Sequence, residues 1–360
     1  MMPWLRVRRS FSRLLCCAFC ALAGCETAHF YSQGLHGQWQ ITRGQRLNSA
    51  MIADSATPTR LRVQLEKVER LRAFADWELG LSAREQYAAY KDLNRTYVAW
   101  AIYAAPEFSL EAKTWWYPFV GRLKYRGWFS PLEAKKRAQR LMAQGYDIYV
   151  AGVPAYSTLG WLKDPVLNTF VYLPDTTLAE LLFHELAHQR IFIHGDTDFN
   201  EAFATATGRE GVRRWLRAEG RSRDLDKYDQ AQKREREFIQ LIRQTRAELQ
   251  NLYTQEFRPP EGLLRLEKAK RLALLRTRYD ALKRDRWSGA GDYDVWFTGP
   301  VNNARLNSIA TYYDLVPAFQ ALLGEQHGDL EKFYREVERL GDLRKSARKE
   351  ELQRLPVGAQ

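Results

Sequence analysis

The chain has 360 residues, of which 45% are hydrophobic, and a formal net charge of +12. This length is ample for a hydrophobic core, built as one large unit or two smaller ones. All four cysteines lie at or before Cys25, which excludes disulfides and cysteine-ligated metal sites from the rest of the chain. The stability of the folded part must therefore come from its core.

Residues 1–24 have the pattern of a secretory signal. Four arginines, at positions 6, 8, 9 and 13, form a basic region without an acidic residue. The apolar run that follows, residues 14–22, is only about nine residues long and too short to span a bilayer as a mature helix. Removal of the signal lowers the formal net charge from +12 to +8. This excess fits solubility or nearby anionic surfaces, and nucleic acid is not an expected partner of a secreted chain.

The end of this signal resembles the bacterial lipobox. Leu22-Ala23-Gly24-Cys25 places small residues directly before a cysteine. The resemblance implies that Cys25 receives diacylglycerol and becomes the new N-terminus. Glu26 is not the aspartate associated with inner-membrane retention, so the expected location is the outer membrane of a bacterial cell envelope, facing the periplasm. The alternative is an ordinary cleaved signal with a chance cysteine.

The next part of the chain predicts helices and short strands. Residues 26–60 are mixed in character and are expected to form an irregular connection. Apolar residues at helical spacing predict a helix over 61–79, whereas 87–103 fits either helix or strand. The aromatic and glycine-rich stretch 114–129 suggests strands and turns. Ser130 as N-cap and Pro131 at the first helical position predict a helix to about residue 143.

Two strand candidates, 147–153 and 168–173, flank a loop over 155–165. A helix then starts at a cap among Asp175, Thr176 and Thr177 and continues to about residue 193, where Gly195 and Asp196 break it. A second helix is expected from Asp198 to about residue 219.

Two apolar repeats separated by Pro259-Pro260 predict an antiparallel helical hairpin over 221–287, projecting as a coiled-coil arm. Its many arginines and lysines are interpreted as a solvated face. Two further helices, 301–323 and 329–340, are predicted. They belong to a C-terminal part over 288–345 that is expected to complete an active-site cleft. The charged tail, 346–360, is expected to fray.

The strongest chemical signal is His184-Glu185-Leu186-Ala187-His188, on the helix predicted to end near 193. Histidines four residues apart lie on one helix face and can meet one zinc ion at about 2.0–2.1 Å. This is the H-E-x-x-H arrangement of zinc peptidases, in which the glutamate acts on the water that zinc activates. Glu185 is therefore the candidate general base. The surrounding helix is apolar nearly all round, and buried histidines are costly unless they are paired or bound to metal.

Two residues compete for the third ligand position. His194 follows His184 by the ten-residue interval of H-E-x-x-H-x-x-G-x-x-H peptidases. That pattern needs a glycine where this chain has Ile191, and a helix continuing through Ile191 would carry His194 away.

Glu201 is the favoured third ligand. Asn200-Glu201-Ala202-Phe203-Ala204 resembles the Asn-Glu-x-x-Ala segment of the two-histidine, one-glutamate class of zinc peptidases. Glu201 also has a structural interpretation, because it lies three residues after Asp198 and fits a capping box. Thr205, one turn later, is a candidate to support the ligands.

Beyond this motif, the chain resembles a known family, the predicted bacterial zinc aminopeptidases, many of which are lipoproteins. The resemblance covers most of the mature chain. It rests on the metal motif together with Ala155-Tyr156-Ser157-Thr158-Leu159-Gly160-Trp161, Asp164-Pro165, Gly195-Asp196-Thr197, Phe199-Asn200-Glu201, Glu210-Gly211-Val212, Asn302-Asn303-Ala304, Tyr312 and Val316-Pro317-Ala318-Phe319.

A peptidase of this kind needs a donor for the oxyanion and, for exopeptidase action, an acid for the free amine. Tyr156, Tyr312 and Tyr313 are candidate donors, although each also fits a packed aromatic residue. Asp164, Asp196 and Glu210 are candidate acids, among which the sequence selects none.

We expect a mainly α fold: an α+β zincin-like catalytic domain with a small sheet over 25–220, followed by the hairpin and the C-terminal helices. The expected activity is zinc-dependent hydrolysis of peptides, with aminopeptidase action favoured by the resemblance alone. The alternatives are an envelope endopeptidase or amidase, and a non-catalytic zinc lipoprotein whose hairpin binds partners.

Overall fold

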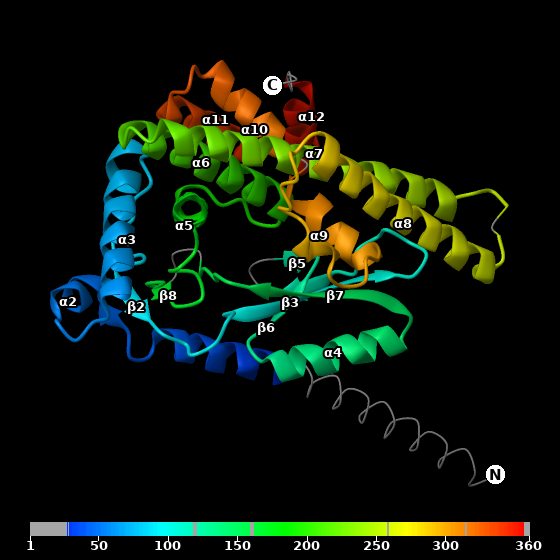
Figure 1. The fold of residues 1–360 in the computed structure, drawn as a ribbon, viewed down its shortest axis with the longest axis horizontal. Coiled ribbons are helices and arrows are strands. Elements are labelled where there is room, and N and C mark those ends of the chain that lie inside the picture. The colour runs from blue at the N-terminus through cyan, green and yellow to red at the C-terminus, as the bar shows by residue number, and fades with distance from the viewer. Residues whose placement is uncertain are drawn as a thin grey trace, which may run out of the picture.

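The structure, a computed structural model, describes residues 27, 29–117, 121–158, 162–257, 259–313 and 315–355, without the side chains of 310–313. It is mainly helical with three small sheets, as the sequence predicts (Figure 1). The predicted signal and Cys25 lie outside the described residues. No described helix is both long and apolar enough to cross a membrane.

The described part of the chain contains the following helices and strands. The helices are residues 29–42, α2 (Asn48–Ala53), α3 (Thr59–Glu78), α4 (Pro131–Ala143), α5 (Asp175–Arg190), α6 (Thr197–Ala218), α7 (Ser222–Tyr253), α8 (Glu261–Asp285), the 3₁₀ helix η1 (Val295–Phe297), α9 (Asn303–Tyr313), α10 (Val316–Glu325), α11 (Leu330–Asp342) and α12 (Lys345–Arg354). The strands are β1 (Arg46–Leu47), β2 (Ala89–Lys91), β3 (Ala99–Pro106), β4 (Trp115–Tyr117), β5 (Gly121–Leu123), β6 (Arg126–Trp128), β7 (Tyr146–Val153) and β8 (Val166–Leu167).

The irregular connection predicted for residues 26–60 is wrong, because residues 29–42 form a helix. Its exposed face carries Tyr31, Leu35 and Trp39, which hides the usual contrast between a polar and an apolar face. Gly37 does not break this helix. A side chain there would collide with the ring of Phe129, so the glycine allows a close approach.

The central sheet has the order β6-β3-β7, and all its pairs are antiparallel. Figure 1 shows α4 on one face of this sheet and α9 on the other. Helix α4 begins as predicted, since the Ser130 hydroxyl accepts a hydrogen bond from the backbone N–H of Glu133 at 3.3 Å. The strand predicted over residues 168–173 is wrong in position: β8 covers Val166–Leu167, and residues 168–172 form turns.

The largest core lies around the antiparallel pair α5 and α6 and reaches α3, α10 and α11. The two helices approach closely at Gly208 of α6. A Cβ atom added there would lie 3.0 Å from the Glu180 carbonyl oxygen and 3.3 Å from the His184 nitrogen. This close packing brings side chains of one helix within reach of the other.

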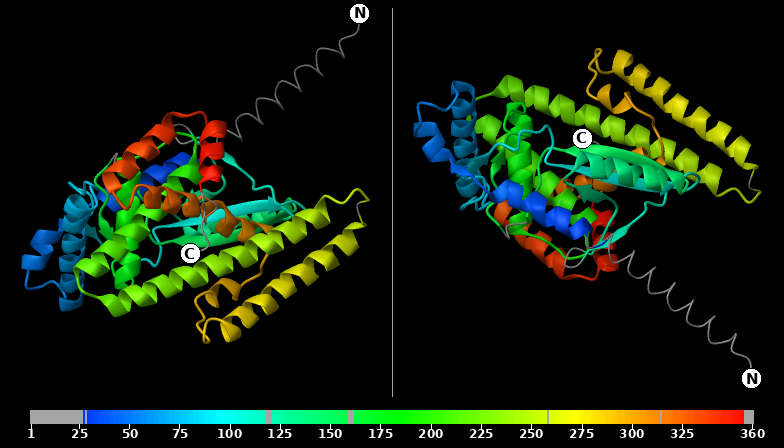
Figure 2. Two further views of the ribbon diagram at one scale, coloured as in Figure 1. Left: turned by 90° about the horizontal axis from the view of Figure 1, so that it is seen from above. Right: turned by 90° about the horizontal axis from the view of Figure 1, so that it is seen from below.

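The predicted hairpin consists of α7 and α8, which run beside the central sheet (Figures 1 and 2). It does not project freely. Its core includes Phe238 and Tyr279 of the hairpin together with Leu110 and Leu306 from outside it. Lys268 of α8 also donates a hydrogen bond to an Asp147 carboxylate oxygen at 2.6 Å.

Two C-terminal predictions need correction. The single helix expected over 301–323 is divided into α9 and α10, and Pro317 lies in the first turn of α10, where proline is tolerated. Of the tail expected to fray, residues 346–354 belong to α12, and residues 356–360 lie outside the described part of the chain. This helix is held because Leu352 packs into the core and Arg348 is buried in an ion pair with Asp196, with an Nη1–Oδ2 distance of 2.6 Å.

Candidate metal centre

His184, His188 and Glu201 form one compact group. The histidines lie one turn apart on α5, and Glu201 lies in the second turn of α6. The His184 and His188 Nε2 atoms are 3.1 Å apart. Glu201 carboxylate oxygens lie 3.4 Å from His184 Nε2 and 3.9 Å from His188 Nε2. The candidate ligand atoms of the three residues all lie within 4.8 Å of one another.

These separations fit a shared metal ion. Tetrahedral ligand atoms at about 2.0–2.1 Å from an ion lie about 3.3 Å from one another. The separations of 3.1, 3.4 and 3.9 Å lie close to this value, with Glu201 Oε2 nearest to His184 and Glu201 Oε1 nearest to His188. Two imidazole nitrogens and one carboxylate also form a known three-ligand set for catalytic zinc. The group can therefore hold a metal ion.

The end of α5 decides which predicted third ligand comes close. The helix stops at Arg190, and Ile191 is extended with φ of −141°. The Asn200 side chain fixes the following turn by bonding both the N–H and the C=O of Ile193 at 2.8 Å. His194 is not part of the metal-ligand group; its ring lies 5.5 Å from that of Phe192. The structure thus brings Glu201 to the histidine pair.

The capping box that offered a structural role for Glu201 is not formed. Asp196, not Asp198, occupies the N-cap position of α6, and its side chain makes no cap hydrogen bond. Asp196 instead pairs with Arg348 and with Lys345, while Asp198 pairs with Lys124 at 3.1 Å. Glu201 therefore has no capping role, and its carboxylate contacts the two histidines instead.

Burial and mutual contact set the charges of the group. Burial lowers the pKa of His188 to about 4, so this imidazole is neutral at pH 7 and keeps a lone pair for a metal. Burial also opposes the ionised form of Glu201, but the hydrogen bond from His184 and the charges of His188 and His184 together outweigh it and lower the pKa of Glu201. At His184, the hydrogen bond with Glu201 and the negative charges of Glu201, Glu185 and Glu180 together outweigh burial and raise the pKa of that imidazole.

Thr205 supports the group from α6, as the sequence suggests. Its Oγ1 lies 3.4 Å from His184 Nδ1, on the ring edge opposite Nε2. A polar contact at Nδ1 orients the ring and leaves Nε2 directed at Glu201 and His188. The Nδ1 atom of His188 is buried without a hydrogen-bond partner among the described residues.

Glu185 lies in a partly buried position next to the group. Burial raises the pKa of Glu185 to about 7; the negative charges of Glu201 and Asp164 act in the same direction, and the charge of His184 opposes them. A hydrogen bond from the Ser157 hydroxyl also favours the ionised form. Such a carboxyl group exchanges its proton near neutral pH, as a general base requires.

Sequence reasoning missed how the loop after β7 is organised. Buried Asp164 accepts a hydrogen bond from the Thr158 N–H at 2.8 Å, and its Oδ2 lies 3.3 Å from the Ser157 hydroxyl, whose single proton can be donated either to Asp164 or to Glu185. This brings Ser157 and Asp164 beside Glu185, and burial raises the pKa of Asp164. The polar pair Ser157-Thr158, six or seven residues before an aspartate, was the only local signal.

The other predicted site residues have different outcomes. Tyr156 is 41% exposed and packs edge-on against Phe129, with ring centroids 5.4 Å apart. The side chain of Tyr312 lies outside the described part of the chain. Of the three acids considered for binding an amine, Glu210 pairs with Arg214 at 3.0 Å and Asp196 pairs with Arg348. The third acid, Asp164, lies near Glu185, and its negative charge raises the pKa of Glu185.

The fold and the site together define a mainly helical protein in which two adjacent helices present two histidines and a glutamate that can hold a metal ion. A family model matches residues 29–352, and the chain belongs to that family, which is described as "Putative aminopeptidase". Neither the curated proteins nor the solved structures contain a match to this chain.

Proposed function

We propose that this protein is a zinc-dependent peptidase that removes N-terminal residues from peptides. The observation that carries the proposal is the convergence of His184, His188 and Glu201 on one point, with Glu185 beside them. Membership of the aminopeptidase family supports hydrolysis of peptide bonds.

In this proposal the side chains of His184, His188 and Glu201 hold the zinc ion. Zinc, when bound, supplies a Lewis acid that activates water and polarises a peptide carbonyl group. Neutral His188 and ionised Glu201 have the protonation states that a cation needs in its ligands. Thr205 keeps the ring of His184 in the orientation for binding.

Glu185 is the proposed general base and, later, the general acid. Its carboxylate takes a proton from the attacking water and passes it to the leaving amine. The pKa of about 7 suits both transfers, because the ionised and protonated forms are then both accessible at neutral pH. The Ser157 hydroxyl can donate a hydrogen bond to this carboxylate and so favours its ionised form.

We also propose that the mature protein is attached to the periplasmic face of the outer membrane through lipid on Cys25. The support is the sequence alone: a basic region, a short apolar run and small residues before the cysteine. Labelling with a radioactive fatty acid in cells, with Cys25→Ser as control, tests the attachment. Incorporation into both proteins, or into neither, would contradict it.

The peptidase proposal is tested with matched chromogenic substrates, an aminoacyl-4-nitroanilide and its N-acetylated form. We expect cleavage of the free amine only, loss of activity after treatment with a chelator, and recovery when zinc is added. Cleavage of both forms would instead favour an endopeptidase or amidase. Zinc binding without cleavage of any peptide would favour a non-catalytic zinc lipoprotein.

A further inference from the structure

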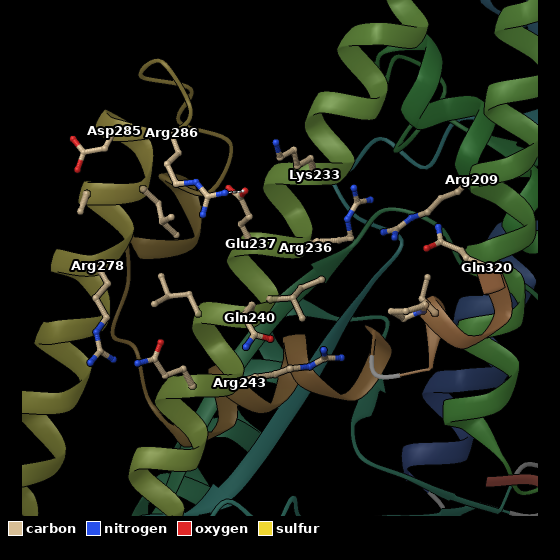
Figure 3. Close-up of a pocket in the computed structure, with 17 residues that line it drawn as sticks. Arg209, Lys233, Arg236, Glu237, Gln240, Arg243, Arg278, Asp285, Arg286 and Gln320 are labelled. Atoms are coloured by element: carbon tan, nitrogen blue, oxygen red, sulfur yellow. Dashed lines mark ion pairs between the residues drawn. The ribbon is translucent and has the colours of Figure 1, made fainter. Parts of the chain in front are cut away.

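A second polar site lies away from the metal-ligand group, between α7, α8 and the start of α10 (Figure 3). It is an open pocket of about 970 Å³, a size typical of ligand sites. None of the residues His184, His188 and Glu201 lines it. Its lining contains six basic side chains and two acidic ones, Glu237 and Asp285; the basic ones are Arg209, Lys233, Arg236, Arg243, Arg278 and Arg286.

Helix geometry gathers half of this positive charge. Lys233, Arg236 and Arg243 follow one another on α7 at intervals of three and seven residues, which places them on one face of the helix. Figure 3 shows Arg236 and Arg243 directed from α7 toward Arg209 of α6 and Gln320 of α10. Helices α6 and α7, which follow one another in the chain, and the distant helix α10 thus contribute to one pocket.

Arg209 is a fixed part of the pocket wall. Its side chain is 4% exposed, and it pairs with Glu180 of α5 at 3.4 Å and with Glu235 of α7. The Tyr228 hydroxyl donates to the second oxygen of Glu180 at 2.7 Å and completes the network. These contacts hold the Arg209 guanidinium in place before any ligand arrives.

The pocket contains positive charge that its own acids do not balance. Arg286 pairs with Glu237 and Arg278 pairs with Glu248, each at 2.7 Å. Lys233 and Arg236, by contrast, form no ion pair with a described residue. Burial lowers the pKa of the Arg236 guanidinium, and the nearby cations Arg213 and Arg209 lower it further, against a smaller opposing effect of Asp229 and Glu235. Arginine and lysine offer only donors, so these side chains cannot satisfy one another.

We propose that this pocket is an anion site that binds a phosphate-bearing ligand. A phosphate group offers several acceptor oxygens and more than one negative charge, so a single group can bridge donors from α6 and α7. A carboxylate carries one charge and matches one guanidinium. The phosphate can belong to a soluble molecule or to a lipid headgroup, since the recognising chemistry is the same.

Titration calorimetry of the full-length protein with inorganic pyrophosphate tests this inference. The variant Lys233→Gln/Arg236→Gln removes the two cations that lack ion pairs. The control Arg217→Gln/Arg223→Gln removes two exposed cations near the junction of α6 and α7. We expect the pocket variant to bind pyrophosphate about tenfold more weakly or worse, and the control to bind like the unmodified protein. Binding to a lipid headgroup is tested in parallel by co-sedimentation of the same proteins with phosphatidylcholine vesicles, with and without phosphatidic acid.

The outcomes separate the sources. Pyrophosphate binding that depends on Lys233 and Arg236 supports a soluble phosphate ligand. Binding only to vesicles with phosphatidic acid, with the same dependence, supports a lipid headgroup. Binding of polyglutamate without either phosphate probe would overturn the proposal in favour of an acidic peptide. Equal weakening in both variants, or no binding of any probe, would also overturn it.

Discussion

The two antiparallel helix pairs of this protein are held together in different ways. Helices α5 and α6 meet through small residues, and Gly208 brings their backbones close. Helices α7 and α8 meet through large side chains such as Phe238 and Tyr279, and charged residues other than buried Lys268 lie mainly on their outer faces and on the pocket rim. Helices α5 and α6 can therefore direct metal-ligating side chains at one point, whereas α7 and α8 line a pocket.

The largest expected effect concerns chemistry on α5. Glu185→Gln should lower kcat by about 10²–10⁴-fold, because the amide cannot accept a proton from water. The amide has nearly the size of the carboxylate, so the zinc content and the unfolding free energy should stay close to those of the unmodified protein. Steady-state kinetics together with elemental analysis measure both. Activity within a few-fold of the unmodified protein would remove Glu185 from the proposed mechanism.

The next effect concerns the buried ion pair that fixes the start of α6. Arg348→Met leaves Asp196 buried without its main partner, so unfolding free energy should fall by about 3–5 kcal/mol. Urea denaturation measures this change. Arg354→Met is the control, because the Arg354–Glu350 pair is exposed and 3.8 Å long. Equal stability of the two variants would show that α12 does not hold α6.

A smaller effect tests the close approach of α5 and α6 directly. Gly208→Ala places a methyl group against the backbone of α5, which is a part of the chain that cannot move freely. We expect a loss of about 1–3 kcal/mol in unfolding free energy and weaker zinc binding, because His184 must shift.

The matched control for this change is Gly34→Ala in the helix of residues 29–42, where nothing lies within 4 Å of the added Cβ. This variant should gain stability, by up to about 1 kcal/mol, because alanine favours helix more than glycine does. A gain in both variants would mean that α5 and α6 are not closely packed.

The smallest effect is a pH-dependent one at the start of α5. Burial opposes the ionised form of Asp175, but Lys67 and Arg221 outweigh it and lower the pKa of Asp175 below 3.8. A lowered folded-state pKa gives stability that is present above the unfolded pKa and is lost as pH falls through the folded value.

Lys67→Met should therefore lower unfolding free energy by about 0.5–1 kcal/mol at pH 7, with no difference from the unmodified protein at the acid end of the transition. Lys270→Met, on the exposed face of the hairpin, should change nothing measurable at either pH. A deficit of Lys67→Met that persists or grows in acid would contradict this account of Asp175.

Much of the local structure could be predicted because its signals are local. Ser130 and Pro131 mark the start of α4, and the spacing of His184 and His188 places both on one face of α5. The helix of residues 29–42 could not be predicted, because its exposed apolar face removes the expected pattern.

The parts that sequence reasoning missed depend on distant residues. Arg348 binds Asp196 across 152 positions, and this pair decides that Asp196 begins α6. Arg209 reaches Glu235 only because α6 and α7 lie side by side in the fold. The basic residues of α7 were interpreted as a solvated face for the same reason: α7 alone does not reveal that Arg209 and Gln320 face it across a pocket.

In the proposed function, His184, His188 and Glu201 hold zinc. The most direct test is the zinc content per chain of the purified protein and of Glu201→Ala and His194→Ala, measured by elemental analysis. We predict one zinc ion per chain in the unmodified protein and in His194→Ala, and strong loss in Glu201→Ala. Full zinc content without Glu201, or no zinc in any of the three proteins after zinc is supplied, would contradict the account.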